Sequence, residues 1–155
     1  MPSTYLTYSG FERLHGELEF LRGVKRQEIA TYLKDSDGGK DSEGDISPEF
    51  VLARQQQAFI EGRILELETL LSNPEIIDNH LHGEFVDIGS RVTITENNEN
   101  AVSYTIVGPV EASPVQGLIS YASPLGSALI GHRSGDDVIV KAPGGVYQVH
   151  IIEVI

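Results

Sequence analysis

The acidic segment at residues 35–49 is the part of the sequence best equipped for chemistry. It reads DSDGGKDSEGDISPE and holds six carboxylates against one lysine. Carboxylate oxygens are the ligands that Mg²⁺ and Ca²⁺ prefer, so the segment suits a metal ion or a basic protein surface. A solvated turn without a ligand is the plainer alternative. A calcium loop is not indicated, because Lys40 stands where such a loop needs glycine and Ile46 where it needs glutamate.

Composition restricts the partners that the chain can have. Its 155 residues include 11 basic and 23 acidic side chains, for a net charge of −12, and no cysteine. This charge repels nucleic acid and anionic membrane, so we expect no direct DNA binding and no membrane partner. The lack of cysteine excludes disulfides and thiolate metal sites. Because no apolar run approaches the roughly 20 residues of a membrane span, and no signal peptide is evident, we expect a soluble, cytoplasmic monomer.

Two amphipathic helices are predicted, one on each side of the acidic segment. The first covers residues 11–34, where leucines recur every three or four positions, and a capping box of Ser9 and Glu12 precedes it. The second covers residues 48–73, with Ser47 as N-cap, until a proline stops it. Two helices joined by a loop pair antiparallel, so the sequence predicts a coiled-coil hairpin with the carboxylates at its tip.

Short strands separated by turns are predicted in the second half of the chain. Alternating residues at 91–95 and 103–107 flank an Asn-rich turn and predict a hairpin. Further strands are expected at residues 117–120, 138–140 and 146–154, with a short helix inside residues 123–131. The fold class is therefore α+β, with a helical hairpin followed by an antiparallel sheet.

Other residue types with chemical potential lack a supporting pattern. The five histidines have no convincing ligand spacing, and His80 and His82 are expected to be exposed in a linker. Serine, histidine and aspartate occur without a nucleophile elbow, and the Gly-Gly turn at residues 144–145 lacks the residues of a phosphate loop. We therefore expect no independent active site, no enzyme activity and no cofactor of the protein's own.

Several short segments, taken in order and with their spacing, resemble the bacterial Gre-type transcript cleavage factors and their inhibitory homologues. The resemblance covers essentially the whole chain. The segments are GFERL (10–14), ARQQQ (53–57), LSNP (71–74), SPLG (123–126), ALIG (128–131) and PGG (143–145).

The resemblance implies a two-domain organisation and a protein partner. It implies an antiparallel coiled coil at residues 1–75, a linker at 76–84 and an FKBP-like domain at 85–155. The partner would be RNA polymerase, with the globular domain docked outside and the coiled coil inserted in the secondary channel. The contact residues that it implies are Ala122, Ser123, Pro124, Leu125 and Gly126. An acid often stands in the family where this chain has Ala122.

The resemblance also implies a role for the tip carboxylates. They would help to hold the second catalytic Mg²⁺ of the polymerase, with Asp45 and Glu43 assisting transcript cleavage by water. The residues expected to share the metal are Asp41, Glu43, Asp45 and Glu49. Two metals that clamp the attacking and leaving oxygens favour in-line hydrolysis, and an acidic tip can complete the shell of the weaker metal.

The tip departs from the pattern of cleavage-competent members. Gly-Asp-Ile-Ser at residues 44–47 matches, but Pro48 follows directly where the family has a Glu-Asn pair, and additional acids stand upstream. This departure favours an inhibitor or modulator of transcription as the main prediction, with a cleavage stimulator as its alternative. A peptidyl-prolyl isomerase is a third possibility from another class, although residues 85–155 offer few aromatics for its pocket. A structural adaptor with an inert tip is a fourth.

Overall fold

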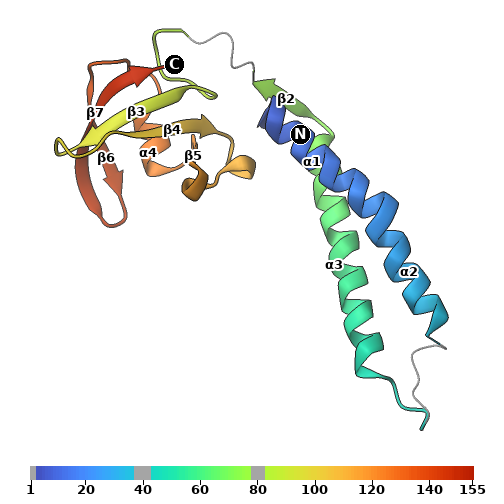
Figure 1. The fold of residues 1–155 in the computed structure, drawn as a ribbon. Coiled ribbons are helices and arrows are strands. Elements are labelled where there is room, and N and C mark those ends of the chain that lie inside the picture. The colour runs from blue at the N-terminus through green and yellow to red at the C-terminus, as the bar shows by residue number, and fades with distance from the viewer. Residues whose placement is uncertain (1–2, 37–42, 78–82) are drawn as a thin grey trace. The chain divides into compact units, whose positions relative to one another are not determined.

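The chain divides into two compact units in the computed structural model, which describes residues 3–36, 43–77 and 83–155 (Figure 1). The hairpin unit is Phe11–Asn73, and the sheet unit combines Met1–Gly10 with Pro74–Ile155. The sequence-based boundary at residue 75 had placed the first ten residues with the coiled coil. Among the described residues, no helix is long and apolar enough to cross a membrane.

The hairpin unit consists of two helical arms that lie side by side (Figure 1). Its elements are α1 (Tyr8–Phe20), a π-helical turn (Leu21–Lys25), α2 (Arg26–Asp35) and α3 (Pro48–Leu71). Ser47 caps α3, because its hydroxyl accepts a hydrogen bond from the backbone N–H of Phe50 at 3.1 Å. This confirms the predicted N-cap of the second helix.

The first arm differs from its prediction in two ways. Helix α1 begins at Tyr8, and Thr7 rather than Ser9 caps it, with its hydroxyl accepting from the N–H of Gly10 at 3.1 Å. The arm is also not one uninterrupted α-helix, because the π-helical turn lies in its middle and contains Gly23. Glycine permits backbone departures that other residues resist, so this position is where the helix can change its hydrogen-bond pattern.

Cross-helix ion pairs connect the two arms. Arg63 donates to both carboxylate oxygens of Glu17, at 2.7 and 3.0 Å, and Arg26 does the same to Glu61, at 2.7 and 2.8 Å. Arg22 and Glu68 form a third pair. The buried apolar residues of the unit are Leu14, Leu18, Ala53, Ile64 and Leu67.

The sheet unit contains a five-stranded sheet whose strand order is β5-β4-β3-β7-β6. Its strands are β3 (Arg91–Glu96), β4 (Val102–Val107), β5 (Leu118–Ser120), β6 (Asp137–Ala142) and β7 (Gly145–Val154). The predicted β3–β4 hairpin is confirmed, and the sheet is antiparallel as predicted except between β4 and β5, which pair in parallel. Two 3₁₀ turns (Pro109–Glu111 and Pro114–Gln116) lie in the connection between these two strands.

A second, smaller sheet was not predicted. Strand β1 (Thr4–Thr7) pairs in parallel with β2 (Pro74–Ile77), so that Thr4 lies opposite Pro74 and Thr7 opposite Ile77. The pairing explains why the first ten residues belong to the sheet unit. Residues 76 and 77 are therefore strand rather than linker, and residues 78–82 of the predicted linker lie outside the described part of the chain.

Helix α4 (Pro124–Leu129) packs on the hydrophobic core of the five-stranded sheet (Figure 1). Ser123 caps it by accepting from the N–H of Gly126 at 3.0 Å, and the same hydroxyl donates to the carbonyl of Ser120 at 2.7 Å. Gly126 is buried, and a Cβ atom there would lie 2.0 Å from the carbonyl oxygen of Ser120. Only glycine allows this approach. The core residues are Val86, Val92, Ile94, Ile106, Ile119, Leu129, Val138, Val140, Val149 and Ile151.

The Glu17–Arg63 pair should couple the two arms in a pH-dependent way. The hydrogen bond from Arg63 lowers the pKa of Glu17 below its ordinary value of 4.5. The pair therefore stabilises the folded state above that value, and the stabilisation is lost as the pH falls through the lowered pKa. A double-mutant cycle of Glu17→Gln and Arg63→Met, followed by urea unfolding, should give a coupling free energy of about 0.2–1 kcal/mol at pH 7 and a smaller one at pH 3.

The control for this cycle is Lys25 and Glu28, which pair within one arm at 3.3 Å. Their coupling should be about 0.2–0.5 kcal/mol, as for other pairs on one helix surface. A Glu17–Arg63 coupling of the same size at both pH values would contradict the assignment of the pair to the ionised carboxylate.

Substitution of Gly126 by alanine should destabilise the sheet unit. The new methyl group cannot be accommodated without movement of the Ser120 backbone, so we expect a loss of about 1–3 kcal/mol in the free energy of unfolding, the usual cost of overpacking. Gly16→Ala is the matched control, because a Cβ at this helical position meets no atom within 4 Å. The control should be neutral or stabilising by up to about 1 kcal/mol. Equal effects of the two variants in thermal unfolding would refute the close approach.

Candidate functional site

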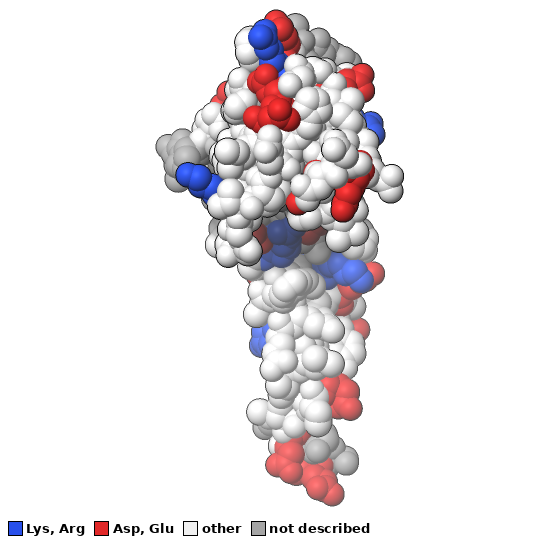
Figure 2. Space-filling view, turned by 90° about the vertical axis from the view of Figure 1, so that its left-hand side faces the viewer, with Lys and Arg blue, Asp and Glu red and all other residues white. Residues whose placement is uncertain are grey.

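The described part of the tip presents three of the four predicted metal-sharing carboxylates to solvent. Glu43, Asp45 and Glu49 are all exposed, whereas Asp41 lies outside the described residues. Figure 2 shows acidic side chains gathered at the end of the hairpin. The tip, defined here as residues 43–49, is thus a surface rich in carboxylate oxygens, as the sequence predicts.

The start of α3 places these acids near a helix N-terminus. Glu49 is in the first turn of α3, and Asp45 lies two residues before the N-cap Ser47. The unsatisfied N–H groups at a helix N-terminus favour negative charge, so the helix offsets part of the repulsion between the carboxylates. This local order results from Ser47 and Pro48, which fix where the helix begins.

The described tip carboxylates are not by themselves a metal centre. Within residues 3–36, 43–77 and 83–155, no three His, Cys, Asp or Glu side chains come together as a group that could hold a metal ion. Hard oxygen ligands that are exposed in this way can still add to the shell of an ion that a partner already holds. The chemistry available at the tip is therefore the donation of oxygen ligands.

A mostly apolar groove, which was not predicted from the sequence, lies between α2 and α3. Its walls include Ile29, Tyr32, Leu52 and Ala53, and it extends to Glu49. Tyr32 and Leu52 are about half exposed, at 48% and 56%. Ala53 occupies a buried position where a leucine would fill more of the space, and the alanine- and glutamine-rich composition of residues 53–58 is the signal that could have indicated it.

The predicted docking segment at residues 122–126 lies at the start of α4. Ala122 and Pro124 are exposed, whereas Leu125 packs against the core and Gly126 is buried. Ser123 is occupied by its two hydrogen bonds in the cap. The side chains that this segment offers to a partner are therefore mainly those of Ala122 and Pro124.

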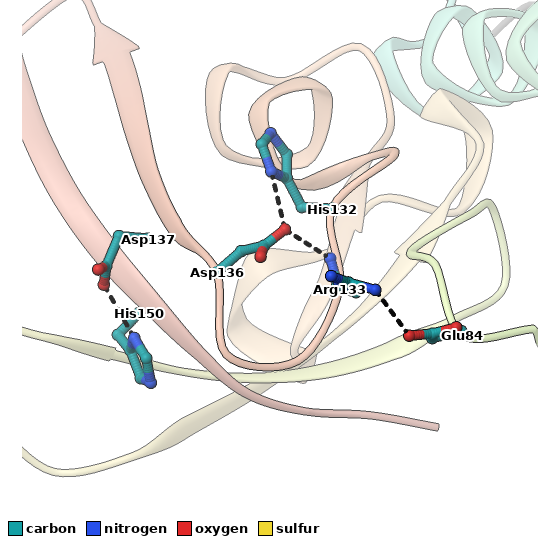
Figure 3. A network of polar contacts seen from close by, with 6 residues as sticks. All are labelled: Glu84, His132, Arg133, Asp136, Asp137 and His150. Atoms are coloured by element: carbon teal, nitrogen blue, oxygen red, sulfur yellow. Dashed lines mark hydrogen bonds and ion pairs between the residues drawn. The ribbon is translucent and has the colours of Figure 1, made fainter.

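Two histidines of the sheet unit form separate pairs with neighbouring aspartates (Figure 3). His132 Nδ1 lies 3.3 Å from Asp136 Oδ2, and His150 Nδ1 lies 2.8 Å from Asp137 Oδ1. The backbone N–H of Arg133 donates to Asp136 and, together with His132, lowers the pKa of that carboxyl. These contacts join the turn before β6 to its neighbours, which gives both histidines structural partners. His80 and His82 lie outside the described residues.

Family models match the two halves of the chain. The model described as "Transcription elongation factor, N-terminal" matches residues 4–76, and that described as "Transcription elongation factor, GreA/GreB, C-term" matches residues 81–155.

Curated relatives match nearly the full length. Transcription elongation factor GreA of Thermoanaerobacter pseudethanolicus is 42% identical over 153 residues, which cover 96% of this chain and 95% of the relative. GreA of Acetivibrio thermocellus is 44% identical over 153 residues, with 96% and 94% covered. Among solved structures, GreA factor homolog 1 of Thermus thermophilus is 32% identical, covers 99% of both chains and has a TM-score of 0.44. The chain belongs to the GreA/GreB family of transcription elongation factors.

Proposed function

We propose that this protein binds RNA polymerase and stimulates cleavage of the transcript in backtracked elongation complexes. The observation that carries the proposal is the match of both halves of the chain to elongation factor models, together with relatives named transcription elongation factor over 96% of its length. A factor that promotes elongation fits these names better than an inhibitor does. We therefore prefer the cleavage stimulator, which the sequence offered as the alternative, over the inhibitor, which was the main prediction.

The tip supplies oxygen ligands in this proposal. Glu43, Asp45 and Glu49 are exposed at the end of the hairpin, which suits insertion into a narrow channel that leads to a metal site. A Mg²⁺ ion held by the polymerase would stabilise the charge that develops on the attacking and leaving oxygens. The carboxylates of this chain would complete the ion's shell and orient a water molecule, so the protein would act on the polymerase's own reaction.

Docking would be the task of the sheet unit. The exposed side chains of Ala122 and Pro124 stand on a turn that Ser123 and Gly126 hold rigidly. A rigid turn loses little conformational entropy on binding, which favours its use as a contact surface.

The departure of the tip from the family pattern supports a second candidate function. The chain lacks the Glu-Asn pair before its second helix, and Pro48 follows Ser47 directly. A tip that enters the channel without completing the metal shell would slow nucleotide addition instead of promoting cleavage. One assay on a stalled polymerase distinguishes cleavage stimulation from inhibition.

Substitution of the tip acid Asp45 should slow cleavage of the transcript. A backtracked polymerase complex with Mg²⁺ is incubated with the wild-type protein or with Asp45→Asn, and the RNA length is followed on a gel. We expect shortened, re-extendable transcripts with the wild type, and a rate reduced by about 10–100-fold with Asp45→Asn, as is typical when the ligand environment of a metal is altered.

Glu19→Gln is the matched control for this assay. Glu19 is an exposed acid on α1, so the substitution removes one negative charge away from the tip. It should leave the cleavage rate within about twofold, because exposed charges more than about 10 Å apart are largely screened. Slower elongation without shortened RNA in the wild-type reaction would favour the inhibitor, and equal rates for Asp45→Asn and wild type would exclude a metal-directed role of Asp45.

An acid at position 122 should strengthen binding to the polymerase. The family often has an acid there, and Ala122 is exposed in this chain, so Ala122→Asp restores the charge without disturbing the fold. We expect the concentration for half-maximal effect to fall by up to about fivefold, which corresponds to the roughly 0–1 kcal/mol of one exposed ion pair. Ala122→Lys, the control that introduces the opposite charge, should raise the concentration for half-maximal effect. Unchanged affinity for both variants would place the docking surface elsewhere.

A further inference from the structure

A second apolar groove on the hairpin adjoins the one between α2 and α3. It lies between the π-helical turn and α3, and Lys25, Gln56 and Ile60 line both grooves. Phe20 and Phe59 stand on its walls and are 50% and 76% exposed, so neither belongs to the core of this chain. The two grooves form one continuous surface, the hairpin groove, whose apolar walls are Phe20, Ile29, Tyr32, Leu52, Phe59 and Ile60. Single exposed apolar residues are ordinary, but adjoining ones mark an interaction surface.

The sequence of the first arm explains why the two arms leave this space open. Leu14, Leu18 and Leu21 follow one another in steps of four and three residues. The same pattern, continued, would place the next residues that face the other arm at positions 25 and 28. These positions hold Lys25 and Glu28, whose charges would be costly to bury between two helices. The space between the arms is therefore not filled by apolar side chains at this level.

The π-helical turn Leu21–Lys25 accommodates the interruption of the pattern. The N–H of Arg26 donates to the carbonyl of Leu21, five residues back, so this turn contains one residue more than an α-helical turn. The apolar pattern resumes at Ile29, eight positions after Leu21, where a heptad would have seven. Single π-helical turns inside α-helices are frequent at functional sites. Here the turn lies directly on the hairpin groove, because Leu21 and Lys25 line it.

The charges around the hairpin groove restrict its occupant. Lys25 is engaged within the chain, because its Nζ lies 3.3 Å from Glu28 and 5.8 Å from the centroid of the Phe20 ring. Glu28 and Glu49 line the part of the groove that reaches the tip. A second copy of the chain would bring the same net charge of −12, so repulsion opposes a dimer through this surface. The surface best suited to the groove is apolar and has basic side chains beside it.

We propose that the hairpin groove receives an apolar ridge of RNA polymerase, flanked by basic side chains, when the tip enters the polymerase. This inference rests on the proposed function, because it takes the polymerase as the partner of the tip. The groove extends to Glu49 in the first turn of α3, so a partner that surrounds the tip also meets the groove. Burial of Phe20 and Phe59 would contribute more to binding than exposed ion pairs do.

The first test measures the affinity of Phe59→Gln for purified bacterial RNA polymerase. The chain has no cysteine, so a fluorescent dye can be attached to Asn100→Cys between β3 and β4, and binding is followed by fluorescence anisotropy. We expect Phe59→Gln to raise the Kd by about tenfold, as for an anchor residue of an interface. Glutamine forms helix at least as well as phenylalanine, and Phe59 is mostly exposed, so thermal unfolding should match that of the wild type.

Leu65→Gln is the matched control for this measurement. Leu65 is also on α3 and is 65% exposed, but it does not line the hairpin groove. It follows Phe59 by six positions, which places it about 120° away around the helix. The control should change the Kd by less than about twofold, because residues outside an interface contribute little to its affinity. An unchanged Kd for Phe59→Gln, or equal weakening by both substitutions, would overturn the inference.

A second test identifies the occupant of the hairpin groove. Gln55 lines the groove, so Gln55→Cys can carry a benzophenone crosslinker, with Leu65→Cys as its control. After irradiation with purified polymerase, mass spectrometry should find Gln55→Cys joined to a polymerase segment in which apolar residues stand beside lysine or arginine. The control should give far less of this product. Crosslinks between two copies of the chain in place of the polymerase product would identify a dimer interface and overturn the inference.

Neither measurement uses RNA cleavage, so a failure of the proposed function can be told from a failure of the inference. A wild-type chain that binds polymerase more tightly than Phe59→Gln, but does not shorten the transcript, would count only against cleavage stimulation. A wild-type chain that shortens the transcript while Phe59→Gln binds equally well would count only against the groove. A wild-type chain that does not bind polymerase would overturn both.

Discussion

The pairing of α3 with the first helical arm is the interaction on which the position of every tip carboxylate depends. Its buried side chains lie mostly at the end away from the tip, where Leu14 and Leu18 on one arm and Ile64 and Leu67 on the other are buried. Burial of one such side chain is worth about 1.5–3 kcal/mol, whereas an exposed ion pair contributes roughly 0–1 kcal/mol. No residue of the first arm from 21 to 35 is buried. The hairpin is therefore stabilised mainly at its base.

This uneven distribution of stability would suit a segment that adapts to a partner, which is the role we propose for the tip. Regions with few buried apolar contacts open at lower free energy than the core to which they are attached, and binding loops come from this class. Between α2 and α3 the arms are connected by the Arg26–Glu61 pair and by half-buried residues such as Ile29 and Ile60. A tight core there would thicken the hairpin, because leucines in place of Ala53 and its neighbours would separate the helices.

The sequence was most informative where one local rule determined the outcome. Ser47 followed by Pro48 begins a helix, and the alternating residues around 91–107 form a hairpin, because caps and period-two patterns act over a few residues. The features that were missed depend on distant partners. Strand β1 pairs with β2, and Thr7, which caps α1 in place of Ser9, also donates its hydroxyl to the distant Glu111. A periodic pattern in the sequence does not reveal contacts between residues that lie far apart along the chain.

The same distinction between local patterns and contacts of distant residues applies to the candidate site. The exposed position of the tip carboxylates could be predicted from the sequence, because a dense run of acids between two helices is expected to lie at an exposed end of the hairpin. The groove beneath them was not predicted, because a groove is a property of how two helices pack. The parallel β4–β5 pair was missed for a related reason: the connection between these strands is built from two 3₁₀ turns that carry no strong sequence pattern.

The Ser-Pro-Leu-Gly segment shows that residues shared with a family can be required by the fold and need not contact a partner. Gly126 is required by its approach to the Ser120 carbonyl, Ser123 by its two hydrogen bonds, and Leu125 by the core. The fold alone would retain these three residues, whether or not a partner touches them. Their presence therefore says that the turn is built correctly, and specificity for a partner has to come from the exposed residues beside them. If the turn docks as we propose, Ala122 is the position whose change would alter affinity, because its side chain is exposed and does not pack in the core.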